Sequence, residues 1–271
     1  MRHIDLNTVI ATVPEDILKK LKSIDDSMPG KTDSEKEAAA NKGNVHWTPL
    51  KIHFEASSNR KCWYTESKNP GCLNDVEHFR PKGKKTCANN KIIHWYWFLA
   101  FNPINYRISC TLPNRLNKNA VLGATGGKHD HFPLMGNSKY ATDLTAVTHE
   151  FPVILDPCNQ DDVKLLAFSL DGRPVISPKF SGDMVACARV EKSNLLLNLD
   201  YPTFNEDREQ LYNKVKNLVE RGDRYFAQNS DNLSDVIDDL RALFHPTAEY
   251  SKAAECYVRC FRDRIWIEDM F

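Results

Sequence analysis

Two carboxylates and an imidazole fall within four consecutive residues of this sequence, Asp75-Val76-Glu77-His78. If this segment is a strand, the side chains of Asp75 and Glu77 point to the same face. Hydrolysis of a phosphodiester needs a hard cation held by oxygen ligands, and a base whose pKa is near neutrality. Carboxylates and a histidine supply both. The alternative is the charged end of a surface strand, whose side chains pair locally.

A stretch rich in cations begins at the same place. From His78 to His129 the sequence contains no Asp or Glu. Clustered cations bind a phosphate backbone, because each contact releases condensed counterions. The alternative is a solvated basic face. The stretch holds nine fixed positive charges: Arg80, Lys82, Lys84, Lys85, Lys91, Arg107, Arg115, Lys118 and Lys128.

The composition is that of a folded globular protein. Hydrophobic residues make up 41% and charged residues 27% of the 271 residues, and 36 Lys plus Arg balance 36 Asp plus Glu. These values exclude the low-hydrophobicity signature of disorder. The sequence begins without the apolar region of a signal peptide and contains no apolar run long enough to span a bilayer. We therefore expect a cytoplasmic protein with no membrane partner, whose eight cysteines are thiols or metal ligands.

Hydrophobic periodicity predicts an α+β fold with most of its mass in helices. Weak periodicity between residues 60 and 134 favours short strands and turns, followed by a buried extended segment over 151–157 and a hairpin over 165–177 that turns at Asp171-Gly172. Helices are expected over 14–29, 34–41, about 47–56, 206–228, 233–244 and 249–269.

The segment Asp75-Val76-Glu77-His78-Phe79-Arg80-Pro81-Lys82 resembles the signature of HNH nucleases, and the similarity extends to Cys62–Glu66, Asn105–Cys110 and Asn114-Arg115 with Lys118. The resemblance implies a small ββα-metal (HNH) nuclease core embedded in a mainly helical chain. It implies that His78 is the general base, that Glu77 is a metal ligand and that Asn105 braces the loop. Asn114 is the second ligand, and the cofactor is Mg²⁺ or Mn²⁺. Asp75, on the same strand face as Glu77, is a further candidate ligand.

The expected nucleic-acid contacts lie in the basic stretch: Arg80, Lys82, Lys84, Lys85, Arg107, Arg115 and Lys118.

The octapeptide recurs with three other segments in one order in the PtuB family, the HNH component of Septu-type antiphage defence, found also beside retrons. The three segments are Trp95–Phe101, His131–Leu134 and Leu155–Cys158, and the similarity covers roughly residues 46–210. It implies a PtuA-like ATPase partner and, in the retron-associated form, a reverse transcriptase with its msDNA. DNA is the substrate that the family implies by default, and a structured RNA such as tRNA is the alternative.

The sequence departs from this family at a structural zinc site. Relatives carry two C-x-x-C pairs, whereas this chain has Cys62-x-x-Thr65 and Cys110-x-x-Pro113. Two thiolates do not complete a tetrahedral zinc site. Cys72 and Cys87 have no spacing that would indicate a replacement, so we expect no structural zinc.

Three regions follow from these patterns. Residues 1–59 form an N-terminal helical arm that could dock a partner, residues 60–160 form the HNH nuclease core, and residues 161–271 form the hairpin and C-terminal helices. The expected function is a metal-dependent HNH endonuclease that acts as a defence effector. The rival is a noncatalytic subunit that binds nucleic acid or a partner through a degenerate HNH site.

Overall fold

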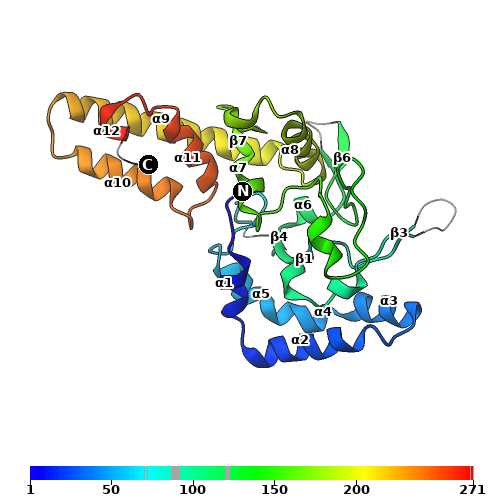
Figure 1. Ribbon diagram of the computed structural model, residues 1–271. Helices are drawn as coiled ribbons and strands as arrows, with labels where there is room; N and C mark the ends of the chain where they lie inside the picture. Colours follow the sequence, from blue (N-terminus) through cyan, green and yellow to red (C-terminus); the bar gives the residue numbers. More distant parts are fainter. Residues whose placement is uncertain (70, 72, 87–91, 120–122, 269, 271) are drawn as a thin grey trace.

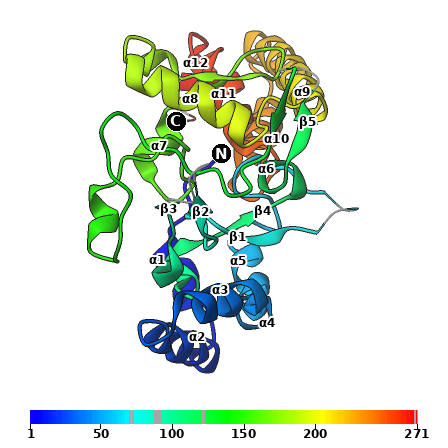
Figure 2. The ribbon, with the colours of Figure 1, turned by 90° about the vertical axis from the view of Figure 1, so that its right-hand side faces the viewer.

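The structure, a computed structural model, describes residues 1–69, 71, 73–86, 92–119, 123–268 and 270. It is an α+β arrangement of helices and small antiparallel sheets, as the sequence predicts. Figures 1 and 2 show helices from the two ends of the chain at opposite ends of the molecule, with the short strands between them. Within the described residues, no helix is both long enough and apolar enough to cross a membrane.

The central element is a pair of antiparallel strands, β1 (Asp75–His78) and β4 (Tyr106–Ser109). Because side chains alternate along a strand, each strand presents one apolar and one polar face. The pairs Val76 with Ile108 and His78 with Tyr106 share one face, and the pairs Asp75 with Ser109 and Glu77 with Arg107 share the other. The segment Asp75-Val76-Glu77-His78 is therefore a strand, so the side chains of Asp75 and Glu77 do point to the same face.

The N-terminal helices cover the apolar face of this sheet. They are α1 (Leu6–Ala11), α2 (Glu15–Ser27), α3 (Asp33–Lys42), α4 (Asn44–Trp47) and α5 (Lys51–Ala56). The capping box of α3, in which Thr32 and Glu35 bond reciprocally, explains where that helix begins. The helix expected around 47–56 is instead divided by the 3-10 turn η1 (Thr48–Leu50), because Pro49 lacks an amide hydrogen for a continuous helix.

The arm shares a core with the strands. Val9 and Leu21 of the arm are buried in one cluster with Tyr106 and Ile108 of β4. The region assigned to 1–59 is thus continuous, through its buried side chains, with the region assigned to 60–160. Its role in docking a partner stays a prediction.

A short helix, α6 (Thr111–Asn114), follows β4 after one residue and packs against β1. Two small hairpins and two 3-10 turns surround this unit: β2 (Lys85–Thr86) with β3 (Ile92–His94), β5 (Asn117–Asn119) with β6 (Ala124–Gly126), η2 (Trp97–Leu99) and η3 (Pro103–Asn105). The two strands of the central sheet, β1 and β4, are thus followed by α6, with β2 and β3 inserted between β1 and β4 along the chain.

The C-terminal part agrees with the sequence in most places. The expected hairpin is present as β7 (Leu166–Phe168) and β8 (Pro174–Ile176), and the expected buried segment has Val153, Ile154 and Leu155 at its centre. The helix expected over 249–269 ends early, at Arg259. The remaining elements are η4 (Ala146–His149), α7 (Gln160–Lys164), η5 (Pro178–Phe180), α8 (Met184–Leu196), α9 (Pro202–Ala227), α10 (Leu233–Phe244), α11 (Ser251–Arg259) and α12 (Ile265–Glu268).

Candidate functional site

His78 lies at the end of β1, on the apolar face of the sheet. Its ring packs edge-on against Trp47 and Tyr106, with centroid separations of 4.7 and 5.0 Å, and only 8% of the residue is exposed. Its Nε2 lies 2.9 Å from the carbonyl oxygen of Ala100. Because a carbonyl only accepts, Nε2 carries the proton and Nδ1 keeps the lone pair in the neutral ring. The ring is thus held in the tautomer whose Nδ1 can accept a proton.

Burial lowers the pKa of His78 from 6.5 to about 3, against the opposing effect of the bond to Ala100. The unfolded chain therefore binds this proton first as the pH falls. We expect His78 to reduce stability progressively between pH 6.5 and about 3, by up to about 1.4 kcal/mol per pH unit. Urea unfolding of the wild type and of His78→Gln across this interval isolates the contribution, because Gln can donate to Ala100 and does not titrate. Parallel pH profiles for the two proteins would contradict the burial of a neutral His78.

Asn105 holds the chain immediately after His78. Its Oδ1 accepts from the amide of Arg80 at 2.8 Å, and its Nδ2 donates to the carbonyl of Arg80 at 2.9 Å. The backbone carbonyl of Asn105 also accepts from the amide of Phe79 at 2.8 Å. A single buried side chain therefore satisfies both backbone groups of Arg80, and the role of Asn105 in a nuclease site stays a prediction.

Glu77 points to the opposite face from His78 and is held by two buried partners. The Nζ of Lys128 binds Oε1, and the hydroxyl of Tyr64 donates to Oε2 at 2.9 Å. The same Nζ donates to the carbonyl of His78 at 2.8 Å, and the Lys128 side chain is 1% exposed. An ammonium group therefore already neutralises the carboxylate that the sequence assigns to a metal.

Asp75 and Asn114 meet at the other end of β1. The Nδ2 of Asn114 donates to Oδ2 of Asp75 at 3.1 Å, and Arg115 forms an ion pair with the same oxygen at 3.1 Å. These three residues line an open cavity of about 390 Å³ together with Trp47 and Lys51. Asn114 reaches Asp75 because α6, which ends at Asn114, packs directly against β1.

The structure thus brings the predicted residues together in two groups. Asn114 contacts Asp75, whereas Glu77 contacts Lys128, and His78 faces away from both carboxylates. Among the described residues, no group of three or more His, Cys, Asp or Glu side chains is arranged to hold a metal ion. Lys128 is the site residue that the sequence reasoning missed. In the sequence, Lys128 was distinguished only as the last cation of the stretch that contains no Asp or Glu.

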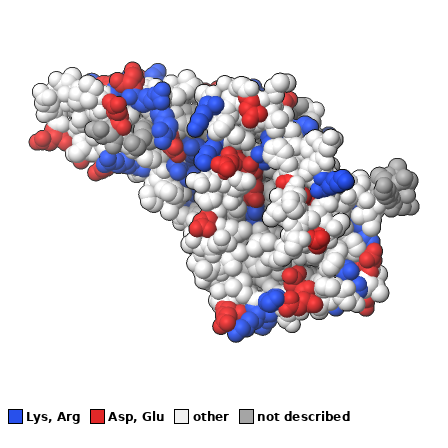
Figure 3. All heavy atoms as spheres, in the orientation of Figure 1, with Lys and Arg blue, Asp and Glu red and all other residues white. Residues whose placement is uncertain are grey.

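Tertiary contacts neutralise much of the basic stretch. Acids outside the stretch form ion pairs with Arg80, Lys84, Arg107, Arg115 and Lys128. Lys91 lies outside the described residues. Within the part of the chain that the structure describes, no acid lies within 4.0 Å of three of the predicted phosphate-binding cations, Lys82, Lys85 and Lys118. Figure 3 shows Lys and Arg interspersed with Asp and Glu on the face that it draws.

The prediction that Arg107 contacts nucleic acid is wrong, because its side chain is buried in an ion pair. Its side chain is 4% exposed and forms two hydrogen bonds of 2.7 Å with the carboxylate of Asp156. This bidentate pair lies across from Glu77 in the strand register. Arg107 therefore joins β4 to the buried segment 151–157, which contains Asp156, and is not available to nucleic acid. Arg80 is also largely enclosed, in a 2.6 Å ion pair with Glu150.

Cys62 and Cys110, 48 positions apart, lie beside one another and beside Thr65. Burial opposes ionisation of Cys62, but hydrogen bonds from Cys110 and Thr65 lower its pKa to about 6. The hydroxyl of Thr65 lies 3.9 Å from the Cys110 sulfur and 2.7 Å from the hydroxyl of Ser67. Hydroxyl and thiol contacts thus surround Cys62 and Cys110. The expectation that no structural zinc is bound stays a prediction.

Neither a comparison with models of known protein families nor a search of curated proteins finds a match for this chain.

Proposed function

We propose that this protein is a metal-dependent nuclease of the HNH type, similar to the PtuB family. The observation that carries the proposal is the β1–β4 strand pair followed by α6, with His78 at the end of the first strand and Asn105 bonded to both backbone groups of Arg80. The short helix α6 then carries Asn114 to the side of β1. This strand, strand, helix arrangement supports a ββα-metal core. The convergence of Cys62 and Cys110 supports the same family.

His78 is the proposed general base. A base must be unprotonated at the working pH, and burial, which lowers the pKa of His78, leaves its ring neutral at pH 7. Because an efficient base has a pKa near the working pH, the proposal requires a substrate phosphate at this ring to raise that pKa in the complex. The bond from Nε2 to Ala100 fixes the ring so that Nδ1 is the nitrogen that takes the proton. Packing against Trp47 and Tyr106 limits ring rotation, which keeps this nitrogen in one direction.

Asp75 and Asn114 are the proposed ligands of Mg²⁺ or Mn²⁺. They offer a carboxylate and an amide oxygen at one cavity, and oxygen donors with water in the remaining positions suit these ions. Glu77 fits less well, because Lys128 and Tyr64 occupy its two oxygens. A bound divalent ion would supply charge stabilisation at the phosphate. Arg115, which now neutralises Asp75, would be free to contact phosphate.

The same ion pairs favour a second candidate function. Lys128 and Arg115 give Glu77 and Asp75 permanent positive partners. A chain in which cationic side chains replace the metal would be a noncatalytic subunit that binds nucleic acid or a partner. A chain that binds nucleic acid but never cleaves it with Mg²⁺ or Mn²⁺ would support this candidate.

The biological setting that we propose follows from the family resemblance alone. The nuclease would act in the cytoplasm as a defence effector beside a PtuA-like ATPase and, in a retron-associated system, a reverse transcriptase with its msDNA. The substrate would be DNA, with a structured RNA such as tRNA as the alternative. A partner that restrains cleavage would protect the host from a free nuclease. Because the N-terminal arm is part of the core beneath β4, docking through it would use its outer surface.

A metal titration tests the ligand assignment. We expect Asn114→Ala to raise the Mg²⁺ concentration needed for half-maximal cleavage of a fluorescent nucleic acid by roughly tenfold, since it removes one oxygen ligand. Asn137→Ala, at an exposed loop position, is the matched control. An unchanged Mg²⁺ midpoint in Asn114→Ala would mean that the ion is held elsewhere.

A further inference from the structure

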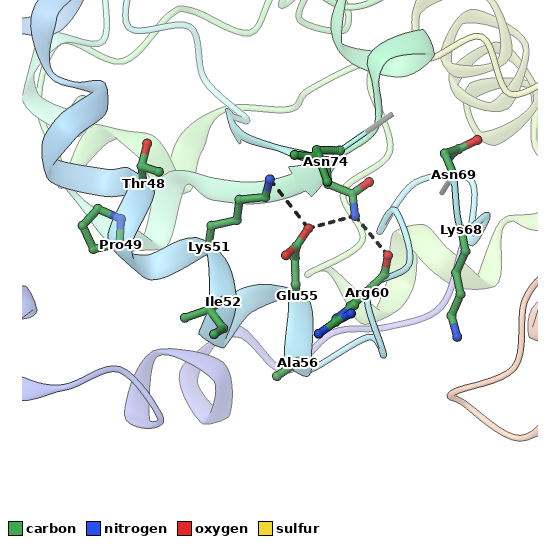
Figure 4. Close-up of a pocket in the computed structure, with 11 residues that line it drawn as sticks. Thr48, Pro49, Lys51, Ile52, Glu55, Ala56, Arg60, Lys68, Asn69 and Asn74 are labelled. Atoms are coloured by element: carbon green, nitrogen blue, oxygen red, sulfur yellow. Dashed lines mark hydrogen bonds and ion pairs between the residues drawn. The ribbon is translucent and has the colours of Figure 1, made fainter. Parts of the chain in front are cut away.

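We infer that the groove along α5 binds an unpaired stretch of nucleic acid strand next to the candidate active site. This inference rests on the proposed function for its substrate, but its geometry is independent of the metal and of His78. The groove has a volume of about 760 Å³, within the usual size range of ligand pockets. Figure 4 shows that one wall comes from α5 and the other from the loop that leads to β1.

The groove has unpaired positive charge. Arg60 and Lys68 line it, and within the described part of the chain neither side chain has an acidic partner at ion-pair distance. The carboxylate of Glu249 accepts from the backbone amide of Lys68 at 2.5 Å but is not among the described residues that line the groove. Glu55 is the one acid among the described lining residues, and it is already bound. Lys51 lies 3.9 Å from its Oε1, and Asn74 donates to the same oxygen at 3.2 Å. The free charge of the groove is therefore positive, which suits phosphate groups.

The same groove exposes apolar side chains. Ile52 on α5 is 70% exposed and Leu73 in the facing loop is 78% exposed. Large apolar side chains at these positions leave apolar area in water unless a ligand covers it. In a duplex the faces of the bases are stacked on one another. Only an unpaired strand presents apolar base faces and a charged backbone to one groove. Single-strand-binding proteins contact base faces mainly with aromatic side chains, whereas here the aliphatic Ile52 and Leu73 would make those contacts.

The groove runs directly into the cavity at the candidate active site. Thr48, Lys51 and Asn74 line both the groove and the cavity that contains Asp75, Asn114 and Arg115. A strand lying along α5 would therefore pass from Arg60 and Lys68 to the proposed ligands of the metal. The groove would therefore bind the nucleotides on one side of the phosphodiester bond that the nuclease cleaves.

Binding without divalent metal tests the inference separately from cleavage. The probes are a short fluorescein-labelled oligothymidylate and the same strand in a duplex, measured by anisotropy in EDTA. We expect Arg60→Ser/Lys68→Ser to weaken binding of the single strand by on the order of tenfold and to reduce the salt-dependence slope by about 1.4. Ile52→Ser/Leu73→Ser should weaken binding with an unchanged slope. Lys192→Ser/Lys214→Ser, which removes two exposed lysines from α8 and α9, should change neither value.

The results distinguish the groove from the nuclease. Equal affinity of the wild type for single strand and duplex, or an Arg60→Ser/Lys68→Ser variant that binds like the control, would overturn the inference even if the protein cleaves DNA. Loss of single-strand binding in that variant, with no cleavage by the wild type under any metal, would retain the groove and refute the nuclease.

Discussion

Replacement of Lys128 by methionine is expected to lower the free energy of unfolding by about 3 to 5 kcal/mol, because it leaves the carboxylate of Glu77 buried without its counter-charge. Methionine retains the apolar length of the side chain, so the loss is mainly electrostatic. Lys128 also bonds the carbonyl of His78, which would lose its buried donor. For a chain of this size the melting temperature should fall by roughly 6 to 20 °C.

The double variant Lys128→Met/Glu77→Gln is the control for this prediction. Its neutral amide can still accept the hydrogen bond from Tyr64, and no charge remains to be compensated. Well-packed neutral replacements of a buried ion pair are often close to neutral in stability, so we expect most of the lost stability to return. A Lys128→Met variant that unfolds within about 0.5 kcal/mol of the wild type would show that this pair is not buried as the structure has it.

The ion pair of Lys128 is an example of a contact that the sequence did not predict. Charge counting along the chain found nine cations without an acid between His78 and His129, and this predicted an open basic surface. The acids that neutralise five of them come from elsewhere, for example Glu150 for Arg80 and Asp156 for Arg107. Local charge density in a sequence cannot reveal partners that only the fold brings near.

Sequence patterns predicted those elements whose structure depends mainly on neighbouring residues. Weak periodicity between residues 60 and 134 predicted short strands, of which β1 is one, and the Asp171-Gly172 turn predicted the hairpin of β7 and β8. Helix α10 matches its expected bounds because its apolar residues recur at helical spacing. Helix α8 was not predicted, since apolar and polar residues are mixed around Met184–Leu196 and no amphipathic stripe marks it.

The roles assigned to the candidate site residues stay predictions, but their contacts can be compared with the motif. Asn105 was expected to brace the loop, and its side chain forms two bonds with the backbone of Arg80. The contact of Asn114 was not foreseen, because the motif names Asn114 and Glu77 as ligands, and only the packing of α6 against β1 shows that Asn114 contacts Asp75. Alternation of side chains sends Glu77 and His78 to opposite faces, which the linear motif conceals.

His78→Gln is expected to reduce the rate of cleavage by about 10² to 10⁴, the usual contribution of a general base. Alanine is a poorer choice than glutamine, because the buried ring of His78 packs against Trp47 and Tyr106, and its removal would leave a cavity. Glutamine can fill part of that space and donate to Ala100, but it cannot take a proton from water. A retained cooperative melt would show that lost activity is not lost folding.

The most direct test of the proposed function is cleavage of single-stranded and duplex DNA and of tRNA by the wild type and by His78→Gln. Each reaction is followed with Mg²⁺, with Mn²⁺ and with EDTA. We expect cleavage by the wild type with a divalent ion, none in EDTA, and at most one percent of the wild-type rate in the folded variant. Cleavage that persists in EDTA, or full activity in a folded His78→Gln protein, would contradict an HNH mechanism at this site.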